Sequence, residues 1–106
     1  MIDYKLLSEM VSDIITKNDN VNIDVSEDDS TIDGFIYDIG FMRDSLSMLY
    51  DIIDSGGIDQ IDQINSLVDA LIMDYKLLIY QYREYNDICS KINHIIIDLE
   101  SIVINS

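Results

Sequence analysis

His94 and Asp98 are the residues of this sequence that come nearest to acid–base chemistry. Asp98 follows the single histidine at the i+4 spacing, which places two side chains on the same face of a helix. An imidazole beside a carboxylate can move protons, but a hydrolytic site also needs a nucleophile, and a metal site needs further ligands. No other Cys, Asp or Glu stands at this spacing from His94. We therefore expect an exposed surface pair, with no catalytic residues, no cofactor and no enzymatic activity.

The segment from Asp24 to Phe35 resembles a calcium-binding loop at its start. Asp24, Ser26 and Asp28 occupy the first, third and fifth positions, where such loops carry oxygen ligands. The sixth position needs a glycine for the turn and is Asp29, and the twelfth needs a bidentate Glu and is Phe35. We therefore expect no metal site in this segment.

A tyrosine-rich stretch between Tyr75 and Tyr85 could offer a stacking surface for bases. Tyr75, Tyr82 and Tyr85 fall on the apolar rows described below, so we expect them in the core with their hydroxyls at its rim. Tyr80 points outward, and the basic residues around it are Lys76, Arg83 and Lys91. This mixed-charge surface could contact a partner, although ordinary solvation explains it as well.

Acidic residues dominate the charge of the chain. Among 106 residues, 21 are acidic and 6 basic, which gives a net charge of −15 at pH 7, while 48% are apolar. The apolar content is too high for a disordered chain, and the length suits a single domain over 1–106. A net charge of this size opposes binding to nucleic acid or anionic lipid, because every phosphate would meet like charge. A charged partner is therefore expected to be basic.

The sequence also bears on location. No apolar run reaches the length of a membrane span, and Asp3 stands where a secretory signal needs a basic region. Cys89, the single cysteine, cannot form an intramolecular disulfide and is expected to be a small buried apolar residue. We expect a protein of the cytoplasm, or of the host cytoplasm if its source is viral.

Apolar residues recur at alternating spacings of three and four, which is the pattern of a helix with one buried face. The longest row is Ile61, Ile64, Val68, Leu71, Tyr75, Leu78, Tyr82, Tyr85, Cys89, Ile92, Ile96, Leu99 and Val103. An earlier row is Ile32, Phe35, Ile39, Met42, Leu46, Leu49 and Ile53, and a shorter one is Tyr4, Leu7, Val11 and Ile14. These rows predict an all-α bundle of antiparallel coiled-coil helices over about 2–17, 31–54 and 58–104.

The boundaries of these helices have local causes. Ser30 can cap the second helix, with Asp33 in a capping-box position. Gly56 and Gly57 can end that helix and reverse the chain. The acidic segment at about 18–30 alternates polar residues with Val21, Ile23 and Val25, which fits a short extended segment or, more simply, a solvated loop.

The third helix is open to two interpretations. It is either continuous over about 70 Å, at 1.5 Å per residue, or broken near Asn86 and Asp87 so that its end folds back. We favour the continuous helix because no Gly or Pro stands there.

The apolar stripe of the third helix is wider than two helices need, and the surplus residues are Leu67, Ile72, Ile79, Ile88, Ile95 and Ile102. They lie either in the core of one chain or in a homodimer interface, and the exposed positions of Phe41, Ile97 and Ile104 favour the dimer.

Aspartate outnumbers glutamate by 17 to 4, although glutamate is the better helix former. The predicted helices therefore carry carboxylates on short, stiff side chains that project away from the apolar rows. Such a coat can imitate a phosphate backbone, or it can simply keep an Ile-rich bundle soluble in an organism with an A/T-rich genome. Four lysines are fewer than such a genome would supply, which favours the first explanation. The residues that we expect to contact a partner are Glu27, Asp28, Asp29, Asp44, Asp51, Asp54, Asp59, Asp62 and Asp69.

In its size, its predicted helices and its acidity, the chain is similar to phage and viral anti-defence proteins that mimic nucleic acid. The resemblance is one of composition and implies an inhibitor that occupies the basic groove of a restriction or CRISPR effector. The alternative is a structural coiled-coil protein, such as a small secretion-system hairpin or an assembly adaptor, that pairs through apolar helix faces.

Overall fold

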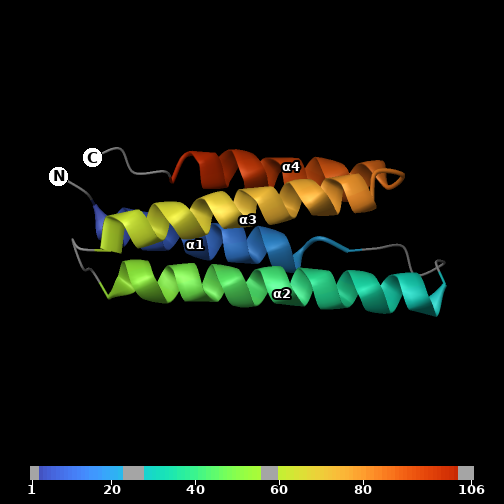
Figure 1. Cartoon of the computed structure of the whole chain (residues 1–106), viewed down its shortest axis with the longest axis horizontal. Coiled ribbons are helices and arrows are strands. Elements are labelled where there is room, and N and C mark those ends of the chain that lie inside the picture. The colour runs from blue at the N-terminus through green and yellow to red at the C-terminus, as the bar shows by residue number, and fades with distance from the viewer. Residues whose placement is uncertain (1–2, 23–27, 56–59, 103–106) are drawn as a thin grey trace.

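The computed structural model describes residues 3–22, 28–55 and 60–102, and these ranges contain helices and no strand. The helices are α1 (Tyr4–Asp19), α2 (Asp29–Asp54), α3 (Ile61–Gln81) and α4 (Asn86–Glu100). They alternate in direction along a bundle that measures 48 × 19 × 18 Å (Figure 1). The predicted all-α class is confirmed, but the prediction of three helices is wrong.

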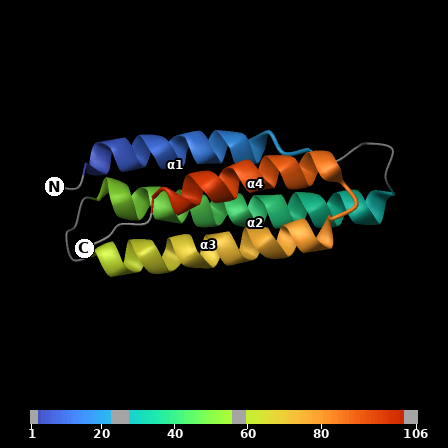
Figure 2. The ribbon, with the colours of Figure 1, turned by 90° about the horizontal axis from the view of Figure 1, so that it is seen from above.

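The helices form a closed ring of neighbours. Each helix packs against the next one along the chain, and α4 completes the ring against α1. In the two views, α1 therefore lies diagonally across from α3, and α2 lies diagonally across from α4 (Figure 2). The surface over α2 and α3, here called the α2–α3 face, is consequently on the opposite side of the bundle from the surface over α1 and α4.

Two aspartates begin the first two helices. The Asp3 carboxylate accepts a hydrogen bond from the backbone N–H of Leu6 at 3.0 Å, and Asp28 accepts one from Thr31 at 2.7 Å. This hydrogen bond holds the pKa of Asp28 below its usual value. The prediction that Ser30 caps the second helix is wrong, because α2 already begins at Asp29 and Ser30 lies inside its first turn. An Asp at this position satisfies a free N–H group and also interacts favourably with the helix dipole.

The third predicted helix is broken, so the expectation of a continuous helix is wrong. α3 ends at Gln81 and α4 starts at Asn86, with a tight turn held by a hydrogen bond of 2.9 Å from the Tyr85 N–H to the Tyr82 carbonyl. The Cys89 thiol lies 3.3 Å from the same carbonyl oxygen and donates to it. Arg83 donates to the Tyr80 carbonyl at 2.9 Å. Side chains and the turn itself thus satisfy carbonyls that the break releases, without Gly or Pro.

Burial of apolar surface explains why the chain folds back. Each fully buried Ile or Leu contributes about 1.5 to 3 kcal/mol, whereas a helical hydrogen bond contributes only about 0.5 to 1.5 kcal/mol. A continuous helix over 58–104 would be much longer than α2, which would leave its end uncovered by that helix. Folding back instead buries a complete face of α4, made of Ile88, Ile92, Ile95, Ile96 and Leu99.

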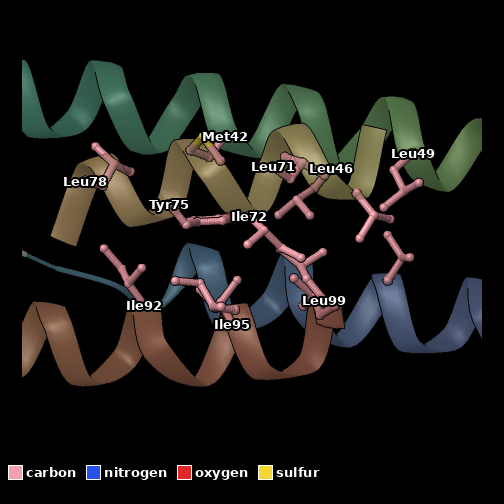
Figure 3. Packing of buried hydrophobic residues seen from close by; sticks show 14 of the residues in the cluster. Met42, Leu46, Leu49, Leu71, Ile72, Tyr75, Leu78, Ile92, Ile95 and Leu99 are labelled. Atoms are coloured by element: carbon pink, nitrogen blue, oxygen red, sulfur yellow. The ribbon is translucent and has the colours of Figure 1, made fainter. Parts of the chain in front are cut away.

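The core runs along the centre of the bundle, and Figure 3 shows part of it between the four helices. Of the six surplus residues, Ile72, Ile88, Ile95 and Ile102 are buried, and Leu67 and Ile79 are half-buried against the core. All six therefore contribute to the core of one chain, four of them fully, and the packing of α4 on α3 and α1 accounts for most of this burial. The surplus stripe therefore no longer argues for a dimer.

One buried polar contact connects three helices. The side-chain amide of Asn18, which is fully buried on α1, accepts a hydrogen bond of 2.7 Å from the Tyr75 hydroxyl on α3. The same amide donates to the carbonyl of Ile39 on α2 at 3.2 Å. Because an unpaired polar group in the core is costly, this contact fixes the relative axial positions of the three helices.

Alkaline pH should destabilise the bundle. Burial, together with the carboxylate of Asp38 at 3.1 Å, raises the pKa of Tyr82 to about 12, and burial also raises the pKa of Tyr75. An unfolded tyrosine titrates near pH 10, so the folded state holds these protons more tightly. The resulting contribution to the free energy of unfolding is fully present below about pH 10 and is lost above it. We expect the melting temperature, followed by circular dichroism, to fall as the pH rises from about 10 to about 12. The fall should be smaller in Tyr82→Phe, and an equal fall in that variant would contradict this assignment.

None of the helices in the described ranges has an apolar stretch long enough to cross a membrane.

Candidate protein-binding surface

Four of the predicted partner-binding aspartates share one side of the bundle. Asp44 and Asp51 lie one heptad apart on α2, and Asp62 and Asp69 lie one heptad apart on α3. All four side chains are exposed, and two residues one heptad apart are separated by about 10 Å along a helix. Because α2 and α3 are neighbours, these four residues, here called the acidic rows, lie on the outer surface of one helix pair.

The structure places the other predicted acids elsewhere or does not describe them. Asp54 lines a cleft of about 430 Å³ between α1 and α2, together with Lys5 and Glu9 of α1. Asp28 caps α2 at its opposite end. Asp29 is the first residue of α2, and nothing further is described for it. Glu27 and Asp59 lie outside the described residues, as do the first four residues of the calcium-like segment and both turn glycines.

Three of the six cations in the described residues neutralise acids on α1 and α4, whereas the exposed Lys76 lies on α3 itself. Lys17 on α1 is bonded to Asp98 on α4, and Lys91 lies 3.4 Å from Asp87 on α4. Arg43 belongs to α2, but it reaches toward α1 and pairs with Asp19 at 2.9 Å. In contrast, no member of the acidic rows takes part in a salt bridge within 3–22, 28–55 and 60–102.

The two helix pairs also differ in their content of charged residues. α2 and α3 contain nine acidic and two basic residues, whereas α1 and α4 contain six acidic and three basic residues. The net charge of the described helices is therefore concentrated on the pair that carries the acidic rows. An exposed and unneutralised carboxylate retains its full interaction with an approaching cation, apart from screening by salt.

No family model, curated protein or solved structure matches this chain. The chemistry of the surface is therefore the basis for a function. No group of three His, Cys, Asp or Glu side chains in the described part of the chain is placed to hold a metal ion. His94 is exposed on α4, as expected, and Asp98, its predicted neighbour, is bonded to Lys17 of α1.

The tyrosines divide between core and surface as predicted from the apolar rows, but the Tyr75 hydroxyl lies inside the core on Asn18 and not at its rim. Tyr75 and Tyr82 are buried, Tyr85 is half-buried, and Tyr80 is exposed. The Arg83 guanidinium lies over the Tyr80 ring at 4.7 Å from its centroid, which is a cation–π contact. The outward tyrosine therefore already contacts a cation of its own chain.

Sequence reasoning missed several exposed apolar residues of α2 and α3. It named Phe41 and Ile97, which are exposed, and Ile104, which lies outside the described residues. It did not single out Tyr37, Met48, Met73 and Leu77, each of which is more than half exposed. The signal was available, since all four are apolar residues that fall off the three-four rows.

Proposed function

We propose that this chain is a non-enzymatic, acidic interaction protein that binds the basic groove of a nucleic-acid-binding protein and thereby excludes the nucleic acid. Such a protein fits the role of a phage or viral inhibitor of a restriction or CRISPR effector. The observation that carries the proposal is the set of exposed, unneutralised carboxylates on α2 and α3. Their stiff side chains lose little conformational freedom on binding, which favours pairing with Lys and Arg.

A second candidate is an assembly protein that pairs through apolar helix faces, with another copy of itself or with a partner chain. The exposed apolar residues on α2 and α3 favour it, because monomeric proteins seldom expose large apolar patches without a function. The two candidates differ in their response to salt. Affinity that depends on charge decreases steeply with ionic strength, whereas affinity that depends on apolar burial does not.

Charge reversal on the acidic rows tests the first candidate. In the triple variant Asp51→Lys, Asp62→Lys and Asp69→Lys, the α2–α3 face would repel a basic groove. We expect its affinity for a target nuclease to fall at least about tenfold, while circular dichroism shows unchanged helicity. The assay is competition with fluorescent duplex DNA for a panel of restriction and CRISPR nucleases, at low and at high salt.

A matched control separates the location of the charge from its amount. The triple variant Glu9→Lys, Asp13→Lys and Glu100→Lys changes the net charge equally, at exposed positions on α1 and α4. We expect it to compete nearly as well as the unmodified chain. Equal losses in the two variants, or an affinity that does not change with salt, would contradict the proposed surface.

A further inference from the structure

Exposed apolar side chains gather on the α2–α3 face. In the described ranges, the other large apolar residues that are exposed stand singly, with Leu6 on α1, Ile36 on the α1 side of α2, and Ile97 on α4. The gathered set, here called the apolar strip, consists of Tyr37, Phe41 and Met48 on α2 with Met73, Leu77 and Tyr80 on α3.

Two contacts fix how the two halves of the strip lie against each other. Tyr82 bonds to Asp38 at 3.1 Å near one end of the helix pair, and Ser55 bonds to Gln60 at 3.0 Å at the other end. The antiparallel register between these contacts places Phe41 opposite Leu77. Tyr37 comes one turn before Phe41, and Tyr80 comes three residues after Leu77, so these two residues are also opposite each other.

Helical spacing places Phe41, Met48 and Leu77 on the edges where α2 and α3 meet, and Tyr37, Met73 and Tyr80 on the outward surface beside them. Phe41 and Met48 continue the row that begins at Asp38, which bonds to α3. Leu77 lies one turn before Gln81, and Gln81 shares a cleft with Thr31 of α2. The strip is therefore one continuous surface across two helices.

The strip is large enough to support binding. Its six side chains are 54% to 74% exposed, and together they offer on the order of 800 Å². A standard protein interface takes about that area from each partner.

Charge identifies the occupant. The acidic rows run through and beyond the apolar strip, since Asp44 lies between Phe41 and Met48, and Asp69 lies one turn before Met73. The contact of Arg83 with Tyr80 at 4.7 Å shows that the edge of the strip accepts a guanidinium group. A second copy of the chain would instead bring a second molecule of net charge −15 against the same carboxylates.

We propose that the α2–α3 face binds a protein segment whose apolar side chains cover the strip and whose lysines and arginines pair with the acidic rows, as in a basic amphipathic helix. The partner is thus recognised both by apolar contact and by charge pairing. A nucleic acid bound to the same partner would supply the negative charge but not the apolar contact. This inference rests on the proposed function, from which it takes the positive charge of the partner. To that function it adds an apolar contact and locates this contact on the apolar strip.

Two synthetic peptides test this inference. One carries leucines along one face of a helix and lysines and arginines along the other, and the second has the same composition in an order without an apolar face. We expect the first peptide to bind at least about tenfold more tightly, measured by fluorescence anisotropy. The double variant Phe41→Gln and Leu77→Gln should abolish this advantage. The matched variant Leu6→Gln and Ile97→Gln, also at exposed positions, should keep it, with unchanged circular dichroism in both.

The inference is overturned if both peptides bind equally, or if the two double variants lose affinity equally. It is also overturned if the unmodified chain sediments as a dimer that Phe41→Gln and Leu77→Gln dissociate, because a second copy then occupies the strip. In the first case the proposed function survives if binding still weakens with salt and with charge reversal on the acidic rows. If charge reversal has no effect on either peptide, the proposed function fails as well.

Discussion

Replacing Leu71 with alanine will lower the free energy of unfolding by about 2 to 5 kcal/mol, the range for truncation of a buried leucine. Leu71 is 1% exposed and lies on α3 in the centre of the core (Figure 3). Truncation removes apolar contacts and leaves a cavity that the rigid helices around it close only in part. Urea unfolding followed by circular dichroism measures the change.

Two neighbouring substitutions on α3 serve as controls. Leu77→Ala removes the same atoms from a side chain that is 65% exposed, so the change should stay below about 1 kcal/mol. Asp69→Ala should have little effect or stabilise slightly, because it relieves repulsion among the acids. If all three variants unfold at the same urea concentration, the orientation of α3 described here is incorrect.

Tyr75→Phe will cost about 1 to 3 kcal/mol, although it removes a single oxygen atom. The substitution leaves the fully buried Asn18 side chain without the donor that lies 2.7 Å from its oxygen. In the Asn18→Leu background the same substitution should cost much less, because the acceptor is already gone. Urea unfolding of the two single variants and the double variant gives the coupling energy. Additive losses would show that the hydrogen bond contributes nothing specific.

The three-four rows were sufficient to predict the all-α class and most of the core. They could not reveal the turn between α3 and α4, because Tyr82, Tyr85 and Cys89 keep the spacing of three and four across it. The spacing reports which residues face the core, and both helices face the same core, so the reversal leaves no gap in the pattern. The mismatch between an expected helix of about 70 Å and its much shorter partners was the better signal.

The candidate surface was predictable in part for a similar reason. Asp44, Asp51, Asp62 and Asp69 stand opposite the apolar rows, so the sequence alone places them outside. Their membership of one face depends on which helices are neighbours, and that is a property of the tertiary structure. Asp54 illustrates the limit, since it follows Asp51 by one turn and yet lies in the cleft toward α1.

The uneven placement of ion pairs has a consequence for the rate of association. α2 and α3 carry more net negative charge than α1 and α4, where Lys17 and Lys91 neutralise acids, so we expect an electric dipole across the short axis of the bundle. In the field of a cationic protein the molecule would turn its α2–α3 face forward before the two surfaces touch. Such orientation raises the fraction of diffusional encounters that are productive, and it weakens as salt shortens the range of the field. The salt bridges of Lys17 and Lys91, each of little value for stability, would thus act on the speed of recognition.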